Sequence, residues 1–182
     1  MKKALFIMLS AALIVCATVA GTLAWLTDKT EPVVNTFTVG DINITLTESD
    51  NLDLKMVPGK DISKDPKVTV KAGSEACWLF VKVEKSGNFD SFMTFEIANG
   101  WTELTEGSGV YYRNVGDKSA DGATDELFPV ISGNKVTVKN TVTKADLNGL
   151  TEATYPTLTF TAYAVQKDGI NDATTAWGKV TP

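Results

Sequence analysis

The chain has 182 residues, 43% of them hydrophobic, with a formal net charge of −5 and no histidine. This acidic balance argues against nucleic acid and anionic lipid surfaces as partners, because both require positive charge opposite their phosphates. The lack of histidine excludes a Ser-His or Cys-His catalytic pair and the H-E-x-x-H zinc motif. We therefore expect a protein that is not an enzyme and that carries no cofactor.

Residues 1–24 have the pattern of a secretory signal peptide. Two lysines open the chain after Met1, and residues 4–20 follow without a charge. The small side chain of Ala24 predicts cleavage before Trp25, with a cut after Ala20 as the alternative. An uncleaved membrane anchor is the other interpretation, since the apolar run approaches the roughly 20 residues of a spanning helix. The protein is thus expected to be secreted or surface-associated, and to touch the membrane only through this segment.

The start of the mature chain predicts a strand and then a loop. Residues 36–47 alternate apolar and polar side chains, as a half-buried strand does. The alternation changes phase at Gly40 and Asp41, which indicates a bulge or a bend. Pro58 and Gly59 predict a turn that closes the loop after this strand.

The middle of the chain contains several strand patterns. Residues 77–84 carry apolar side chains on both faces, so we expect this strand to be buried on both sides, with Cys77 in the core. After signal cleavage Cys77 is the only cysteine, which excludes a disulfide within the chain. The apolar spacing of residues 92–97 fits either a strand or a helical turn. Further alternating patterns predict strands at residues 67–71, 110–115 and 135–139.

The C-terminal part predicts one long strand between two helical turns. Residues 158–166 alternate along their whole length, and we expect this strand to lie centrally in its sheet. Residues 144–150 fit a helical turn, and residues 171–177 fit another, with Asp172 as its N-cap. Many short strands with hardly any long helical pattern predict an all-β fold. We expect one antiparallel, jelly-roll-like β-sandwich domain over residues 25–182, with short helical turns and a preceding signal helix.

Two stretches near the N-terminus carry a resemblance to a known family. They are residues 21–28 (GTLAWLTD) and residues 35–44 (NTFTVGDINI), and the Pro-Gly turn in residues 57–60 extends the match. These residues resemble the TasA/camelysin family of Gram-positive bacteria, whose members are released by a dedicated signal peptidase and include biofilm-matrix proteins. Residues 159–167 resemble the last strand of small relatives of that family.

The resemblance implies an extracellular matrix or fibre subunit that assembles by strand donation. In this chain the donated segment would be residues 25–39. Its candidate pocket-filling side chains are Val33, Val34, Phe37 and Val39. The implied partners are other copies of the chain or related matrix proteins, and a signal peptidase during export. An ordinary first strand, folded into its own sheet, is the alternative interpretation of this segment.

An acidic loop at residues 117–126 is the only candidate metal site. Its spacing overlaps that of a calcium loop at Asp117, Ser119, Asp121 and Asp125. Phe128 occupies the twelfth position, where a calcium loop has a bidentate glutamate, so a solvated turn is favoured. The tryptophans are expected to pack in the core, and a ligand platform is the alternative for Trp78, Trp101 and Trp177.

The sequence thus favours an exported structural protein. A monomeric surface adhesin or ligand-binding module on the same sandwich is the second interpretation. A secreted hydrolase is the third, and it would require a pair of carboxylates that the fold brings together.

Overall fold

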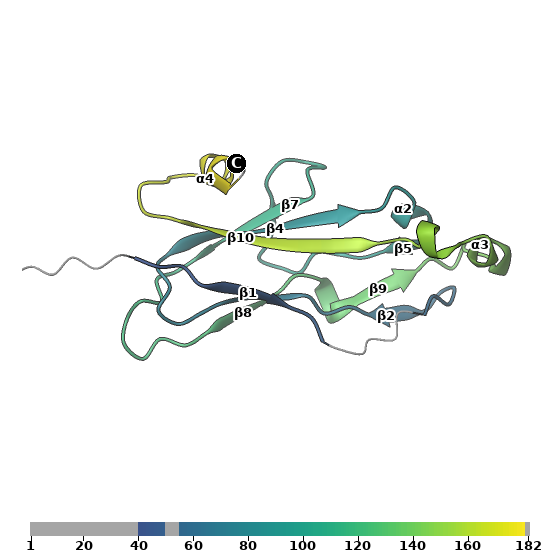
Figure 1. The fold of residues 1–182 in the computed structure, drawn as a ribbon, viewed down its shortest axis with the longest axis horizontal. Coiled ribbons are helices and arrows are strands. Elements are labelled where there is room, and N and C mark those ends of the chain that lie inside the picture. The colour runs from purple at the N-terminus through teal and green to yellow at the C-terminus, as the bar shows by residue number, and fades with distance from the viewer. Residues whose placement is uncertain (1–39, 50–54, 181–182) are drawn as a thin grey trace, which may run out of the picture. The chain divides into compact units, whose positions relative to one another are not determined.

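The computed structural model describes residues 40–49 and 55–180, and Figure 1 shows their arrangement. These residues are mostly β, in three antiparallel sheets with few and short helices, so the prediction of an antiparallel β fold is confirmed. The predicted signal peptide and its cleavage site lie outside the described residues. So do the predicted donated side chains Val33, Val34, Phe37 and Val39.

The first sheet has the strand order β1-β3-β8. Its strands are β1 (Ile44–Thr47), β3 (Lys67–Val70) and β8 (Glu126–Pro129). The predicted N-terminal strand therefore forms only from Ile44 onward within the described residues. The next predicted strand, at residues 67–71, is confirmed. The predicted Pro-Gly turn precedes it, and there Gly59 has a φ of 69° and Lys60 N donates to Val57 O.

The second sheet has the strand order β10-β4-β7-β6. Its strands are β10 (Leu158–Gln166), β4 (Cys77–Lys85), β7 (Val110–Val115) and β6 (Thr102–Glu103). Strand β4 is buried on both faces, as predicted. Within residues 40–49 and 55–180, β10 pairs with β4 alone and lies at the edge of its sheet, which contradicts the predicted central position. Its partly exposed threonines and alanines bury less apolar surface than the large apolar side chains of β4, which has two neighbours.

The third sheet is small and has the strand order β2-β9-β5. Its strands are β2 (Asp61–Ser63), β9 (Lys135–Val138) and β5 (Met93–Thr94). The ambiguous stretch at residues 92–97 combines both interpretations. It begins in the last residue of helix α2 (Phe89–Phe92), continues as β5, and ends where Ile97 pairs with Ile131.

The remaining helices are α3 (Lys144–Asn148), α4 (Ala173–Val180) and the 3₁₀ turns η1 (Ser132–Asn134) and η2 (Glu152–Thr154). The N-cap prediction for α4 is confirmed, because Thr175 N donates to Asp172 Oδ1 at 2.8 Å. Thr143 caps α3, accepting a hydrogen bond from Asp146 N. None of the helices in residues 40–49 and 55–180 has the length and apolar character needed to cross a membrane.

The first and second sheets share a core. Val68 and Val70 of β3 lie in one buried cluster with Leu79 and Val81 of β4, and Cys77 is fully buried there as predicted. Burial raises the pKa of the Cys77 thiol to about 11. A second cluster lies around the third sheet, and a third joins the other face of β4 to α4.

Two polar residues stabilise the first sheet and its neighbours. Arg113 is the chain's only arginine, and its guanidinium carbon lies 4.0 Å from the centroid of the Phe128 ring and 5.3 Å from that of Trp101. This contact links β7 to β8 by cation–π attraction. Asp65 accepts hydrogen bonds from the backbone and hydroxyl of Ser49 and pairs with Lys67 at 2.6 Å. These bonds hold the pKa of Asp65 well below its usual range.

Candidate functional site: an open strand edge and an apolar pocket

The edge strands of the three sheets differ in how well they are protected against pairing with another chain. In the described part of the chain, β1, β2, β5 and β6 are only two to four residues long, and β8 ends at Pro129. Short length and proline are devices that prevent pairing of an edge with further strands. The remaining edge, β10, has neither.

Strand β10 is a long edge without charge. It has nine residues with the sequence LTFTAYAVQ, which contains no charged residue and no proline. It pairs with β4 along its whole length, from Leu158 opposite Lys85 to Gln166 opposite Cys77. All nine residues are half-buried or exposed, whereas the first five residues of β4 are buried. Such an edge is a ready template for an added strand.

Hydrogen bonds at the two ends of β10 show which of its backbone groups face outward. Lys167 N donates to Ala76 O at 2.9 Å, and Ser86 N donates to Thr157 O at 3.0 Å. Because the bonding direction alternates along a strand, the odd-numbered residues of β10 bond to β4. The even-numbered residues direct their N–H and C=O groups away from the sheet: Leu158, Phe160, Ala162, Ala164 and Gln166. Strand β1 of the first sheet approaches β10 without pairing with it (Figure 1).

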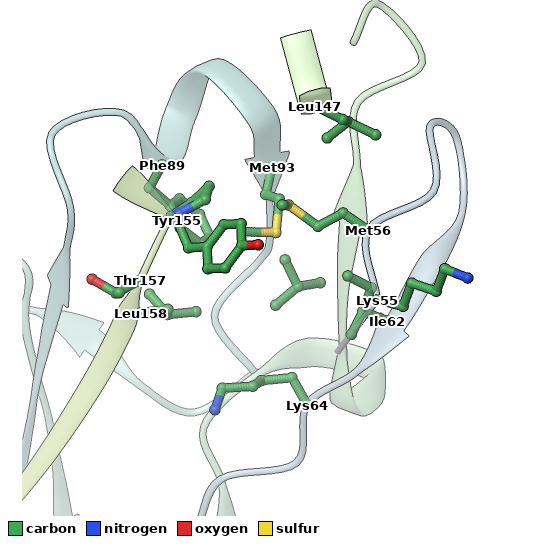
Figure 2. Close-up of a pocket in the computed structure, with 12 residues that line it drawn as sticks. Lys55, Met56, Ile62, Lys64, Phe89, Met93, Leu147, Tyr155, Thr157 and Leu158 are labelled. Atoms are coloured by element: carbon green, nitrogen blue, oxygen red, sulfur yellow. The ribbon is translucent and has the colours of Figure 1, made fainter. Parts of the chain in front are cut away.

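A pocket of about 570 Å³ adjoins the start of β10. Its walls come from the residues around β2, α2, β5, β9 and α3 and from the chain that leads into β10 (Figure 2). Most of the lining is apolar, from Met56, Ile62, Phe89, Met93, Val136, Leu147, Pro156 and Leu158. The volume lies within the range of roughly 300–1,000 Å³ that is typical of small-molecule sites.

Few polar groups line the pocket, and none of them is a carboxylate. Lys64 Nζ pairs with Glu48 Oε2 at 2.7 Å and lies 5.8 Å from the centroid of the Phe160 ring. Tyr155 is 53% exposed, and Figure 2 shows its hydroxyl directed toward the middle of the pocket. The ammonium of Lys55 points away from the other lining residues in the same view. Lys55 and Lys64 are thus the two charged residues in the lining.

The acidic loop does not gather its carboxylates around a common point. Asp117 accepts a hydrogen bond from Ser119 N at 2.8 Å, as in a simple turn. Asp125 pairs with Lys71 Nζ at 2.9 Å and accepts a second bond from Ala72 N. These bonds lower the pKa of both carboxyls. Within the described ranges, no three Asp, Glu, His or Cys side chains form a group that could hold a metal ion, so Asp121 has no such group to join.

The tryptophans serve the core. Trp78 and Trp177 belong to the cluster beside α4, and Trp101 belongs to the cluster between the first two sheets. The indole N–H of Trp78 donates to Ile170 O, and that of Trp101 donates to Pro129 O. The prediction of core packing is confirmed for these side chains.

Sequence patterns missed both parts of this site. The lack of charge in β10 is also what a central strand shows, and the pocket residues come from separate segments of the chain. Comparison with known proteins gives no further guide, because no protein-family model, curated protein or solved structure matches the chain.

Proposed function

We propose that the protein is an exported structural protein, a matrix or fibre subunit in which residues 25–39 of one copy add to the open edge of β10 in the next. The observation that carries this proposal is the nine-residue, uncharged edge of β10. Main-chain hydrogen bonds to such an edge supply affinity, and alternate side chains of the added strand supply specificity. Val33, Val34, Phe37 and Val39 are the side chains proposed to pack against the acceptor.

The lengths of the two partners are compatible. Strand β10 spans roughly 30 Å at 3.3 Å per residue, and its nine residues set the length of the acceptor. A donor of about 15 extended residues reaches up to roughly 50 Å. The donor can therefore cover the whole edge and still connect to the body of its own copy.

Export would control the timing of assembly. In this proposal a signal peptidase cuts between Ala24 and Trp25, and until then the donor segment is tied to the membrane. The proposal includes a TasA/camelysin-like ancestry and a jelly-roll-like sandwich built by the first two sheets. The shared core of these sheets supports the sandwich.

The proposal is tested by measuring the size of purified residues 25–182 over a range of concentrations. We expect oligomers that grow with concentration, and we expect deletion of residues 25–39 to leave a monomer. Circular dichroism of the deleted protein should show the same β signal, which separates loss of assembly from loss of folding. A full-length mature protein that stays monomeric at all concentrations would exclude strand donation. It would favour the alternative in which residues 25–39 complete their own sheet.

A second function, a ligand-binding β-sandwich module, is favoured by the apolar pocket beside β10. A pocket of this volume with a mostly apolar lining and few polar groups is the usual form of a small-molecule site. Its test is direct binding of a ligand whose chemistry the pocket specifies.

A further inference from the structure

We propose that the pocket at the start of β10 binds a single-chain anionic amphiphile, a fatty acid whose tail lies among the apolar side chains and whose carboxylate meets Lys64. This inference rests on the second proposed function, ligand binding, and does not require strand donation. Its support comes from the shape, the lining and the charge of the pocket.

The lining suits a flexible hydrocarbon tail. Met56 and Met93 lie on neighbouring sides of the pocket, and Figure 2 shows their sulfur atoms directed into it. Unbranched, polarisable methionine side chains adapt to flexible apolar ligands. Phe89 and Ile62 close the interior and are 1% and 7% exposed, so the tail would leave water for a packed hydrophobic wall.

The volume suits a small-molecule ligand. The pocket volume of about 570 Å³ lies near the middle of the range of small-molecule sites. A fatty acid of medium length is a ligand of this size class. We therefore take a free fatty acid as the ligand, and a membrane lipid is the alternative that the vesicle measurement tests.

The charge of the pocket selects an acid over a neutral chain. The 12 lining residues include no carboxylate, and one of their lysines, Lys64, pairs at 2.7 Å with Glu48, which is not itself a lining residue. The side chain of Lys64 is 18% exposed, so its charge is screened less than that of a surface lysine. An ammonium has three N–H donors, and Glu48 accepts from one of them. A ligand carboxylate can bind beside Glu48 or displace it.

The test is isothermal titration of the purified protein, with its N-terminus as the exporting cell leaves it, using dodecanoate below its micelle concentration. We expect one site per chain. Lys64→Met should weaken dodecanoate binding tenfold or more, because a charge-assisted hydrogen bond is lost. Lys82→Met is the matched control, since Lys82 also pairs with a glutamate, Glu84, at 2.8 Å and does not line the pocket. Glu48→Gln should strengthen binding, because it removes the competing carboxylate.

Two further measurements define the pocket itself. Leu147→Trp places a larger side chain on helix α3 at the pocket wall, where Leu147 is partly buried, and should weaken binding at least tenfold. Its thermal melting curve should match that of the unaltered protein. Dodecanol, the neutral chain of equal length, should bind at least tenfold more weakly than dodecanoate.

Several results would overturn the inference. The first is a lack of saturable dodecanoate binding, and the second is equal affinity for dodecanol. The third is equal dodecanoate binding by Lys64→Met and Lys82→Met. The fourth is adsorption of the protein to phosphatidylglycerol vesicles that is unchanged in Leu147→Trp, since the protein would then bind a lipid surface outside the pocket. The assembly proposal is judged separately by size measurements, since Leu147→Trp leaves the outward groups of β10 in place. A protein that assembles and binds no dodecanoate would refute the ligand and leave strand donation standing.

Discussion

A single proline at Ala162 provides a sharp test of the open edge. Ala162 lies in the middle of β10, and its N–H faces away from β4. Proline has no N–H and is tolerated in edge strands where that group would face solvent. We therefore expect Ala162→Pro to leave the sheet intact and to block the addition of another strand.

The magnitude follows from the hydrogen bonds involved. Within the protein the substitution removes no ladder bond, so the free energy of unfolding should fall by less than about 1 kcal/mol. In an assembled edge it would remove one hydrogen bond and leave the donor's carbonyl unpaired, at a cost of about 1–3 kcal/mol. A loss of about 1.4 kcal/mol raises the dissociation constant of the assembly tenfold, so we expect association to weaken by roughly tenfold or more.

Thr161→Pro is the matched control on the neighbouring residue. Thr161 lies opposite Lys82 and bonds to β4, so proline there removes a ladder bond and leaves a carbonyl of β4 unpaired. We expect this variant to lose about 2–4 kcal/mol of stability. Urea denaturation measures the stability of both variants, and sedimentation velocity measures the association.

The reasoning is refuted if Ala162→Pro associates as strongly as the unaltered protein. Assembly would then use a surface other than β10. An Ala162→Pro variant as destabilised as Thr161→Pro would show that the register of outward groups is wrong.

Three other predictions concern the fold. Arg113→Lys should lower the free energy of unfolding by about 1–2 kcal/mol, because lysine has no planar cation to stack on the rings of Trp101 and Phe128. Urea denaturation measures this free energy, and an unchanged value would contradict the prediction. Cys77 should resist iodoacetamide at pH 8 in the native protein and react in concentrated guanidinium chloride, because burial raises its pKa to about 11; mass spectrometry gives the extent of labelling. Asp65→Asn should be less stable than the unaltered protein at pH 7. Thermal melting should show this difference in stability narrowing as the pH falls below about 4, since a carboxyl whose pKa is lowered by folding loses its stabilising effect as it is protonated. A difference that stays constant with pH would show that the ionised Asp65 carboxylate does not stabilise the fold.

The sequence by itself determined the local elements of the domain. Alternation of apolar side chains placed strands at residues 77–84, 110–115 and 158–166, each within one residue of the observed bounds. The side chain of Asp172 likewise predicted the start of α4. These features depend on chain chemistry within a few residues, because strand alternation and helix capping are local. The export signal and the donated strand stay predictions, since they concern residues outside the described part.

Only the tertiary structure decided which strand edges and side chains meet. An uncharged strand such as β10 satisfies its alternating pattern equally well at the centre or at the edge of a sheet. In the part of the chain that the structure describes, β10 pairs with β4 alone and therefore lies at the edge. The pocket is lined by Met56, Phe89 and Leu158, which come from distant parts of the chain. In the acidic loop, Asp125 forms an ion pair with Lys71. These outcomes depend on contacts between residues far apart in the chain, which compete for burial and hydrogen bonds only once the sheets have packed.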